Sequence, residues 1–535
     1  MSIDTTTMIR KEVQFAPEKR ISKLVPSLEQ AREFAHYGYK IIPIYQTLAG
    51  DLETPGRVYL KLTQEKSSQW APSFLLESVE GGETVGRFSY VGVNPKLGIE
   101  VFPEGGWIER HPDGSSILHD RHISIDSLRI IESRMPRPNS VAPVSDLPPF
   151  PGGFVGYLGY ECISRWEPTV PTHPDTVGIP DAIFFETGDL IVFDHVKQRM
   201  KVLTSISVED PSEIDRQYRE AVGRIESVVD KLRRPLDPPL EHPPVKEPPA
   251  ENEITSNFTQ EQYEAVVENA KEHIYAGDIF QIVTSQRLSK KTSAEPYTIY
   301  RHFRQESPSP YNVFINLENF QLISASPEIN VKVEGRRILY RPLAGTRPRG
   351  RSKEGDIDVE KDLALERDLI EDPKERAEHV MLVDLGRNDV GRVARWGTER
   401  VTKLMVVERY SKVMHIASQI EAELDPKYTC FDAIRACFPA GTVTGAPKVE
   451  AMRLIHKFEP TRRGPYSGAL GYISYSWDTT MAIAIRTLVK IGNEVFAQSG
   501  GGIVADSVPT TEFEETMHKA SAGLSALDLA EKEEL

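Results

Sequence analysis

The stretch Glu375-Arg-Ala-Glu-His-Val-Met-Leu-Val-Asp-Leu-Gly-Arg-Asn-Asp389 carries two carboxylates directly into an apolar run. Residues three and four apart share one face of a helix, so a helix here points Glu375 and Glu378 the same way. A second stretch, Glu512-Phe-Glu-Glu515, repeats the spacing, and Lys519 follows one turn later on the same face. Two such faces brought together form an all-oxygen site of the kind that Mg²⁺ prefers. The pattern predicts two helices that meet at a metal.

The alternative is that these carboxylates are simply solvated. Acidic residues at helical spacing usually form an exposed face with Lys and Arg, and Lys374 and Arg376 favour that view for the first pair alone. The surrounding sequence favours a site, because the second pair follows Gly500-Gly-Gly-Ile-Val-Ala-Asp-Ser-Val-Pro509. A triple glycine can be a plain turn, but its missing side chains also let backbone N–H groups approach an anion. We therefore expect an anionic substrate beside the metal.

Length and composition narrow the class of protein. A chain of 535 residues can bury one very large core or two to three ordinary ones, and 39% hydrophobic with 27% charged residues is ordinary globular composition. The net charge of −15 does not support a nucleic-acid partner. Cys162, Cys430 and Cys437 have neither disulfide nor metal-ligand spacing. With no 18-residue apolar run, signal peptide or transit peptide, we expect a cytoplasmic protein without membrane contact.

One linker divides the chain. Seven prolines lie between Arg234 and Ala250, a density that excludes helix and favours an extended conformation. The first residues are polar and mixed in charge. We expect four parts: a mobile N-terminal arm over residues 1–25, an N-terminal region over 26–234, a proline-rich linker over 235–256 and a second domain over 257–525.

Local patterns indicate both helices and strands. The clearest helix runs from about Thr259 to Ala276, because Thr259 and Gln262 form a capping box and Gly277 ends the pattern. The basic, Pro- and Gly-punctuated segment 341–351 predicts a loop. By themselves these patterns support only a mixed α and β class. Apolar or alternating runs predict strands at residues 57–62, 189–193, 279–283 and 482–487.

Six longer motifs give the chain a family resemblance. Together they resemble the chorismate-utilising enzymes over roughly residues 40–525 and, among these, the large subunits of anthranilate synthases. The resemblance implies an α+β fold with a large two-layer β-sheet core flanked by helices, to which N-terminal segments contribute; a compact separate N-terminal domain is the alternative. The motifs are Gly277-Asp-Ile-Phe-Gln281, Ser324-Ala-Ser-Pro-Glu328, Pro342-Leu-Ala-Gly-Thr-Arg-Pro-Arg-Gly350, Val383-Asp-Leu-Gly-Arg-Asn-Asp389, Phe438-Pro-Ala-Gly-Thr-Val-Thr-Gly-Ala-Pro-Lys448 and Gly500-Gly-Gly-Ile503.

The resemblance also implies a reaction. It is the Mg²⁺-dependent amination of chorismate at C2, with loss of the 4-hydroxyl and elimination of pyruvate, a lyase step that opens tryptophan biosynthesis. Relatives that add water carry Lys where this chain has Gln281, and aminodeoxychorismate synthases typically carry Lys where it has Ala344. A desolvated Lys can act as a base, whereas Gln cannot. The alternatives are an aminodeoxychorismate synthase and a non-catalytic, amino-acid-sensing regulatory subunit.

By resemblance, Glu378 and Glu515 hold the metal, with Glu375 and Glu512 beside them directly or through water. Arg486 would hold the enolpyruvyl carboxylate, since a planar fork suits a carboxylate, although an exposed strand Arg is the commoner case. Lys519 would meet the ring carboxylate. The other substrate-binding positions that the resemblance implies are Gln281, Ala344, Gly345, Thr346, Tyr466, Gly500 and Gly502.

Three further residues are implied in the chemistry. Hydroxide is a poor leaving group, so a general acid is needed, and the resemblance assigns Glu328 to it. His415 would assist the elimination of pyruvate, and Thr442 would position the substrate hydroxyl or enolpyruvyl side. Taken alone, Glu328 is an ordinary strand-end carboxylate, and a His between apolar residues is more often a satisfied core residue.

A second chain and an inhibitor complete the expectations. None of the three cysteines lies in a nucleophile-elbow context, so the glutamine amidotransferase that supplies ammonia is expected on a partner. Leu75-Leu-Glu-Ser78 resembles the family motif for tryptophan as a feedback inhibitor, although Leu75-Leu76 can also be an ordinary buried strand. Residues 26–234 would then be regulatory and 257–525 the chorismate-binding catalytic domain. The expected tryptophan-binding residues are Ser78, Pro310, Tyr311 and Asn312.

Overall fold

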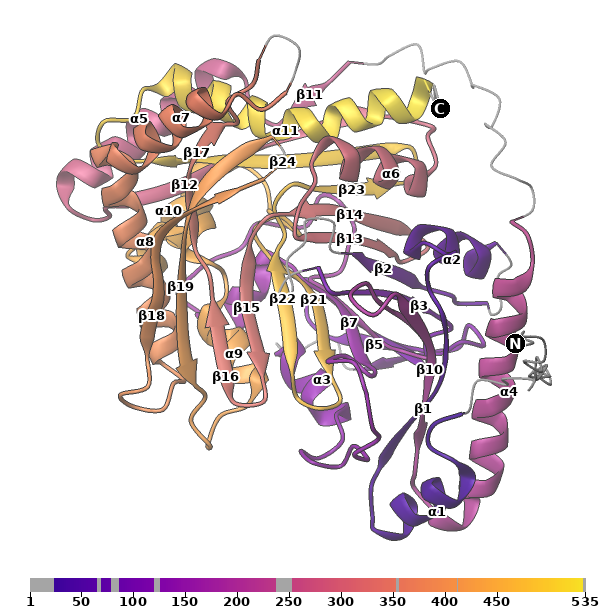
Figure 1. Ribbon diagram of the computed structural model, residues 1–535. Helices are drawn as coiled ribbons and strands as arrows, with labels where there is room; N and C mark the ends of the chain where they lie inside the picture. The colour runs from indigo at the N-terminus through magenta and orange to yellow at the C-terminus, as the bar shows by residue number, and fades with distance from the viewer. Residues whose placement is uncertain are drawn as a thin grey trace, which may run out of the picture.

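A computed structural model describes residues 24–64, 69–77, 86–119, 126–236, 253–352, 356–410 and 412–532. Within these residues the chain forms two large antiparallel sheets of twelve strands each, with helices around them (Figure 1). The expected two-layer β-sheet core flanked by helices is confirmed.

The first sheet has a continuous strand order to which β20 (Gly445–Ala446) adds by pairing with β12. In spatial order its strands are β1 (Ile41–Ala49), β10 (Arg199–Ser207), β9 (Asp189–Asp194), β3 (Phe88–Val93), β2 (Ser73–Glu77), β13 (Tyr311–Asn316), β14 (Phe320–Ser326), β23 (Thr487–Ile491), β24 (Glu494–Ile503), β12 (Gln281–Lys291) and β11 (Thr255–Ser256).

The second sheet is ordered in the same way, and β18 (Arg400–Arg409) adds to it by pairing with β19. In spatial order its strands are β17 (Leu343–Pro348), β19 (Val413–Glu423), β16 (Arg337–Tyr340), β15 (Ile329–Glu334), β22 (Thr479–Ile483), β21 (Ala469–Ser474), β7 (Gly153–Leu158), β8 (Ala182–Glu186), β4 (Leu97–Val101), β5 (Trp107–Arg110) and β6 (Ser116–His119).

Helices cover the edges and outer faces of the sheets, with α11 lying across β24 and α4 beside β1 and β10 (Figure 1). The α-helices are α1 (Leu28–His36), α2 (Pro55–Thr63), α3 (Ser127–Arg134), α4 (Ile214–Arg233), α5 (Gln260–Ala276), α6 (Pro296–Glu306), α7 (Val359–Glu371), α8 (Pro373–Gly391), α9 (Cys430–Cys437), α10 (Lys448–Phe458) and α11 (Pro509–Lys532). Short 3₁₀ turns are η1 (Tyr160–Arg165), η2 (Pro211–Glu213) and η3 (Gly441–Val443).

Strands from both sides of the proline-rich linker join each sheet. In the first sheet β2 pairs with β13, and in the second β7 pairs with β21. This confirms that N-terminal segments contribute to the core and contradicts the alternative of a compact separate N-terminal domain. The four-part division itself stays a prediction, and residues 1–23 and 237–252 lie outside the described residues.

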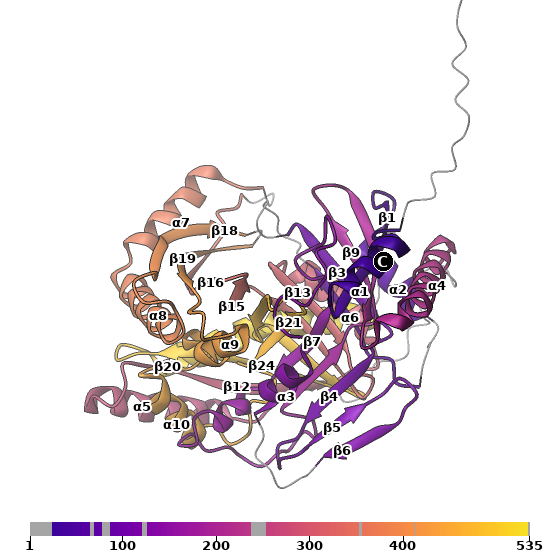
Figure 2. The ribbon, with the colours of Figure 1, turned by 90° about the horizontal axis from the view of Figure 1, so that it is seen from below.

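Apolar side chains fill the space between the sheets. One cluster joins Leu75 and Leu322 of the first sheet to Val155 and Phe185 of the second. A second cluster covers the opposite face of the second sheet, where α3 and α9 pack, and extends to α10, which packs on β12 of the first sheet (Figure 2). Burial of apolar surface on both faces stabilises the second sheet as a middle layer.

Several local predictions are confirmed. Thr259 caps α5 through a capping box with Gln262, and Gly277 ends the helix in the left-handed conformation at φ 85°. The predicted strand at 189–193 is β9. The strand expected at 279–283 begins only at Gln281 and extends to Lys291.

Three local predictions are wrong. Residues 57–62 lie in α2 because Thr54 accepts the Arg57 N–H at 3.2 Å and Pro55 occupies the first turn, two features that favour a helix start. Part of the predicted loop 341–351 is β17, which pairs with β19. The predicted strand 482–487 is interrupted, since β22 ends at Ile483 and β23 starts at Thr487.

None of the helices in the described part of the chain combines the length and apolar character needed to cross a membrane.

Candidate active site

The two acidic helices approach the same glycine-rich strand. A Cβ added at Gly501 of β24 would lie 2.9 Å from Glu512 Oε2, and one added at Gly502 would lie 3.3 Å from Glu378 Oε1. A side chain at Gly501 would meet the Glu512 carboxylate of α11, and one at Gly502 would meet Gln281 Nε2 of β12 at 2.7 Å and crowd Glu378 of α8. The glycines are needed so that Glu378 and Glu512 can reach neighbouring backbone positions.

The four carboxylates differ in their partners. Glu375 Oε1 pairs with Arg347 Nη1 at 3.0 Å, Glu378 Oε1 accepts a hydrogen bond from Gln281 Nε2 at 2.6 Å, and Glu515 pairs with Lys519 at 2.7 Å. Glu512 Oε2 is buried and has no hydrogen-bond partner among the described residues. The acidic helices are thus held near the site without using all their carboxylate oxygens.

Burial raises the pKa of both Glu378 and Glu512, and their carboxylate neighbours on the same helix add to the shift. An added cation would favour the charged forms and would satisfy the unpaired Glu512 oxygen. Within the described residues, no group of three or more His, Cys, Asp or Glu side chains could hold a metal by itself. Mg²⁺ is commonly bound by one or two carboxylates with waters and substrate, so the residues fit a cation of that kind.

Glu328 and Arg486 lie on two neighbouring connections that cross from one sheet to the other. Glu328 lies between β14 and β15, and Arg486 between β22 and β23. The Ile483 N–H donates to Glu328 O, and the Ala325 N–H donates to Arg486 O, each at 3.0 Å. Arg486 has φ 47°, a conformation unusual for a non-glycine residue, which turns the chain out of the strand.

The Glu328 carboxyl group is buried beside the start of β17. Its Oε1 accepts the Leu343 N–H at 3.3 Å. Burial raises the pKa of Glu328 to about 8, although this N–H and Thr442 act in the opposite direction. Glu328 therefore keeps its proton at neutral pH, which is the state that a general acid needs.

His415 of β19 is the second buried titratable group. Its Nδ1 lies 3.0 Å from both Gly345 O and Thr346 Oγ1, while Nε2 is buried without a hydrogen-bond partner among the described residues. Burial, followed by the positive charge of Arg486, lowers the pKa of His415 to about 4. Because Gly345 O can only accept, Nδ1 carries the proton and Nε2 presents a lone pair.

The β17 backbone determines the contact between His415 and Gly345. The pairing of β17 with β19 shifts register between Ala344 and Thr346, and Gly345 at φ 65° occupies the irregular position. A Cβ at Gly345 would lie 2.9 Å from Glu375 Oε2. The same glycine therefore brings the histidine and the first acidic helix close together.

Lys519 connects the parts of the site. Its Nζ donates to Gly500 O at 2.9 Å, and its charge acts on His415, Glu378 and Glu512. On the other side of Gly500, an added Cβ would lie 2.8 Å from the Tyr466 hydroxyl oxygen. The predicted catalytic, substrate-binding and metal residues thus form one continuous set.

Sequence reasoning missed Arg347. This side chain forms ion pairs with Asp368 at 2.6 Å, Asp372 at 3.1 Å and Glu375 at 3.0 Å, so it ties β17 to α7 and to the start of α8. Its position in the basic motif 341–351 was visible, but the three carboxylates come from a different part of the sequence.

A family model described as chorismate binding enzyme matches residues 111–525. The chain belongs to this family. Anthranilate synthase component 1 of Pseudomonas putida is 42% identical over 515 residues, covering 94% of this chain and 99% of the relative. A probable anthranilate synthase component 1 of Schizosaccharomyces pombe is also 42% identical, over 95% of this chain and 98% of the relative.

Solved structures agree with the assignment to the chorismate binding enzymes. Anthranilate synthase component I from Streptococcus pneumoniae has a TM-score of 0.72 at 34% identity, covering 89% of this chain and 98% of that one. The Escherichia coli isochorismate synthase MenF has a TM-score of 0.64 at 16% identity, covering 94% and 99%, which is a likeness of fold alone.

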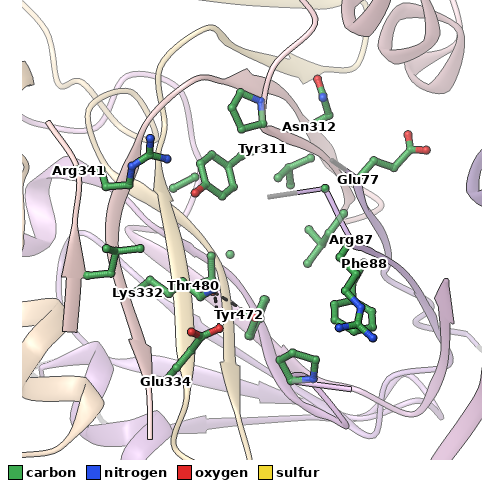
Figure 3. Close-up of a pocket in the computed structure, with 18 of the residues that line it drawn as sticks. Glu77, Arg87, Phe88, Tyr311, Asn312, Lys332, Glu334, Arg341, Tyr472 and Thr480 are labelled. Carbon is green, nitrogen blue, oxygen red and sulfur yellow. Dashed lines mark hydrogen bonds and ion pairs between the residues drawn. The ribbon is translucent and has the colours of Figure 1, made fainter. Parts of the chain in front are cut away.

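Apart from the candidate active site, this chorismate binding enzyme has a cavity of about 780 Å³ between its sheets (Figure 3). Leu76 and Glu77 line it together with Pro310 and Tyr311, because β2 pairs with β13 and sets Glu77 opposite Asn312. The strand β2 is indeed buried, as the ordinary alternative for this motif required, but it also borders the cavity. The pairing of β2 with β13 therefore brings together the two segments that were predicted to bind tryptophan.

The residues predicted to bind tryptophan differ in how their side chains lie relative to this cavity. The Tyr311 ring points into it, whereas the Asn312 side chain points away and donates a hydrogen bond to Ser309 O (Figure 3). Ser78 lies outside the described residues. The cavity is also lined by Tyr410, whose ring centroid is 5.7 Å from that of His415. The wall of the cavity thus reaches a residue of the candidate active site.

Proposed function

We propose that this chain converts chorismate and ammonia into anthranilate, pyruvate and water. The observation that carries the proposal is the buried Glu328 carboxyl, which lies beside Thr442 and on a crossover next to that of Arg486; burial raises its pKa to about 8. Relatives that match this chain over almost their whole length are named anthranilate synthase component 1, which supports the same substrate and product.

Two cations suit a substrate with two carboxylates. The Arg486 guanidinium can bind the enolpyruvyl carboxylate through two parallel hydrogen bonds. Lys519 lies beside Gly500 and can reach the ring carboxylate. Tyr466 and the Gly500–Gly502 backbone would form the wall between these two points. Substrate held at both ends presents the ring to the residues between them, which reduces the entropic part of the barrier.

The residues supply the proton transfers that the reaction needs. Ammonia adds at C2, the ring double bond shifts, and the C4–O bond breaks as Glu328 donates its proton and water leaves. Loss of the C2 proton then accompanies cleavage of the enolpyruvyl C–O bond and release of pyruvate. The His415 Nε2 lone pair is suited to accept that proton, because the ring is neutral and Nδ1 is already bonded to Gly345 O.

Gln281 and Ala344 favour amination over the reactions of other branches. The Gln281 amide donates to Glu378 and cannot act as a base on water. Its Oε1 is buried without a hydrogen-bond partner among the described residues. Ala344 has no nucleophile. These residues speak against isochorismate formation and against aminodeoxychorismate as the product.

Mg²⁺ would be held by Glu378 and Glu515, with Glu375 and Glu512 directly or through water. Bound there, the cation neutralises the charge of the substrate's ring carboxylate as the reaction proceeds. The raised pKa values of Glu378 and Glu512 and the unpaired Glu512 oxygen support a cation at this position.

The relatives' name, component 1, supports a partner component, and we propose that it is a glutamine amidotransferase that supplies ammonia. Cys162, Cys430 and Cys437 are all buried, and burial raises the pKa of each thiol, so none is activated as a nucleophile. The cavity beside Tyr311 is proposed as the site where tryptophan inhibits. A cytoplasmic location stays a prediction.

Glu328 and His415 also bear on the alternative of a non-catalytic sensing subunit. A sensor has no use for a buried carboxyl that keeps its proton or for a buried imidazole with an unused lone pair, and both are costly to bury. Their presence in one site favours an active enzyme.

The decisive experiment is turnover by the purified chain. Chorismate with an ammonium salt at raised pH, where free NH₃ is abundant, should give anthranilate fluorescence and pyruvate in equal amounts, dependent on Mg²⁺. Glutamine without a second chain should give none. Isochorismate, salicylate or a 4-amino product as the main species would contradict the proposal.

The metal assignment has its own matched control. Glu378→Gln and Glu515→Gln should abolish turnover in folded protein, whereas Glu514→Gln should not, because Glu514 is the exposed neighbour of Glu515 on α11. Near wild-type Mg²⁺-dependent activity in both site variants would remove the assignment.

The inhibitor site can be tested at the residue next to Glu77. Ser78→Leu should raise the inhibitory tryptophan concentration roughly five- to a hundredfold, the equivalent of about 1–3 kcal/mol for an unpaired buried polar group, with little change in uninhibited turnover. A variant that loses activity but keeps its tryptophan sensitivity would show that Ser78 belongs to the core of the fold.

A further inference from the structure

His379 is the first buried residue of α8. The residues before it in the helix, including Glu375 and Glu378, are half-buried or exposed, whereas the His379 side chain is 0% exposed. The first two turns of α8 carry both carboxylates proposed for the metal and have little apolar packing of their own. Apart from the contacts of the two carboxylates themselves, the orientation of these turns depends on the contact that His379 makes.

That contact is a buried hydrogen bond to the neighbouring strand. His379 Nε2 lies 2.6 Å from Ser418 Oγ of β19, and Ser418 is 1% exposed. The Ser418 oxygen also accepts the Met405 N–H of β18 at 2.9 Å, and the Ser418 N–H donates to Pro342 O, just before β17, at 3.2 Å. One serine thus joins α8 to three neighbouring strands of the second sheet.

Other anchors of α8 lie further along the helix and begin with the buried Leu382 and Val383. A Cβ at Gly386 would lie 2.5 Å from Tyr340 of β16, and Asp389 pairs with Lys448 of α10. At about 1.5 Å per residue, these points are roughly 10 Å and 15 Å beyond His379. They hold the second half of the helix, and the His379 bond holds the first half together with the contacts that the two carboxylates make.

Contacts at the start of α8 cannot replace it. Asp372 accepts the N–H groups of Lys374 and Glu375, which closes the helix end but does not join it to a sheet. Arg347 bonds to the Glu375 carboxylate itself, so this bond changes whenever that carboxylate takes another ligand. Gln281 of β12 likewise bonds to the Glu378 carboxylate. Among these contacts, only the His379 bond joins the helix to a sheet without using either carboxylate.

We propose that His379 is a positioning residue: its bond to Ser418 sets the rotation of the first two turns of α8 and so places Glu375 and Glu378. Carboxylates lie about 6 Å from the helix axis, so a rotation of about 10° moves them by roughly 1 Å. A displacement of that size can cost about a hundredfold in rate. The proposal rests on the proposed function, in which these carboxylates hold Mg²⁺ beside chorismate.

The test compares His379→Leu, which fills the space without the bond, with His379→Gln, which can still reach Ser418. Ser418→Ala and the double variant His379→Leu/Ser418→Ala complete a double-mutant cycle. Ser89→Ala is the matched control, because Ser89 Oγ and His195 Nε2 form a similar pair at 2.7 Å in the N-terminal strands. Three quantities are measured: kcat and KM for chorismate, the Mg²⁺ concentration for half-maximal rate, and amide hydrogen exchange along α8.

His379→Leu should lower kcat/KM roughly a hundredfold and raise the Mg²⁺ requirement, while His379→Gln recovers most of the loss. The double variant should lose no more than the worse single variant, since both remove one interaction. Amides of residues 375–381 should exchange faster in His379→Leu, with those of 386–391 unchanged. Ser89→Ala should change none of these.

Faster exchange throughout the protein, or lower activity with an unchanged Mg²⁺ requirement, would show that His379 only supports the fold and would overturn the proposal. Wild-type protein without Mg²⁺-dependent turnover of chorismate would instead overturn the proposed function. Hydrogen exchange then still decides whether His379 orients α8, because it needs neither substrate nor metal.

Discussion

Two groups of buried polar and ionisable residues lie side by side in this protein and are built in opposite ways. In the first, Arg463 donates to both Glu459 oxygens at 2.9 and 2.6 Å, to Val443 O at 2.8 Å and to Val283 O at 2.7 Å. Glu459 also accepts both the N–H and the hydroxyl of Ser285. Nearly every donor and acceptor of this group, here called the arginine knot, is used.

The second group is the candidate active site. Here Gln281 Oε1, His415 Nε2 and Glu512 Oε2 are buried without a hydrogen-bond partner among the described residues. Burial raises the pKa of Glu328 and lowers that of His415, so both are neutral at pH 7. A fully bonded cluster stabilises one arrangement of the chain, whereas unused donors and acceptors are free to meet a ligand.

The largest expected effect separates activity from stability at Glu328. Glu328→Gln should lower kcat by about 10²–10⁴-fold, because the proton donor is lost. Between its ordinary pKa of 4.5 and about 8, the folded wild type binds more protons here than the unfolded chain does, so its stability falls as pH rises. The neutral amide avoids this loss, and the variant should melt higher than wild type at pH 8–9 but not at pH 4.

Melting curves at both pH values and single-turnover rates measure this. Wild-type kcat, expressed per free NH₃, should fall above about pH 8 as Glu328 loses its proton. A stabilised variant that keeps its activity would remove Glu328 from the chemistry while leaving its buried, neutral state intact.

In the arginine knot, a substitution should lower the stability of the protein, whereas at Glu328 it should lower the activity. Arg463→Met leaves Glu459 buried without its cation and should cost about 3–5 kcal/mol in the free energy of unfolding, measured with urea. Arg216→Met is the control, since Arg216 is an exposed residue paired only on the surface of α4, and it should change stability by less than about 0.5 kcal/mol. Equal effects of the two variants would contradict the distinction.

His415 tests the unused lone pair itself. Asn at this position can still donate to Gly345 O but has nothing in place of Nε2. His415→Asn should therefore lower kcat about a hundredfold, the lower end of the range for proton transfer, with little change in the melting temperature. A large loss of stability with normal turnover per folded molecule would make His415 a core residue.

The smallest expected effect lies within the arginine knot. Ser285→Ala removes the hydroxyl bond to Glu459 and the acceptor of Gln498 Nε2, and it should cost about 1–3 kcal/mol, with kcat within about twofold of wild type. The cost is modest because Arg463 and the Ser285 N–H still bond to the carboxylate. A loss as large as that of Arg463→Met would mean that the knot fails as a unit.

Much of the local structure could be predicted from single segments. The capping box of Thr259 and Gln262, with Gly277 behind it, predicted α5 almost to the residue. The spacing of Glu375 and Glu378, and of Glu512 and Glu515, predicted which side chains share a helix face. Segment 57–62 was missed because its apolar residues fit both strand and helix, and the deciding groups, Thr54 and Pro55, lie before it.

The interrupted strand at 482–487 shows a different limit. Its alternating apolar pattern is real, yet the chain leaves one sheet at Ile483 and enters the other at Thr487. No local pattern contains the position of the second sheet. The turn that places Arg486 next to the Glu328 crossover is therefore a product of the layered fold.

The sequence by itself determined the helix faces, their caps, the glycines that admit close neighbours and the family. These features depend on residues a few positions apart or on long matching motifs. Only the tertiary structure decided that Gly501 and Gly502 lie against carboxylates of the two acidic helices, that Ser418 forms a hydrogen bond with His379, and that Glu328 keeps its proton. The reason is physical: removal of water raises or lowers a pKa, and which groups lose their water depends on strands that are distant in the sequence.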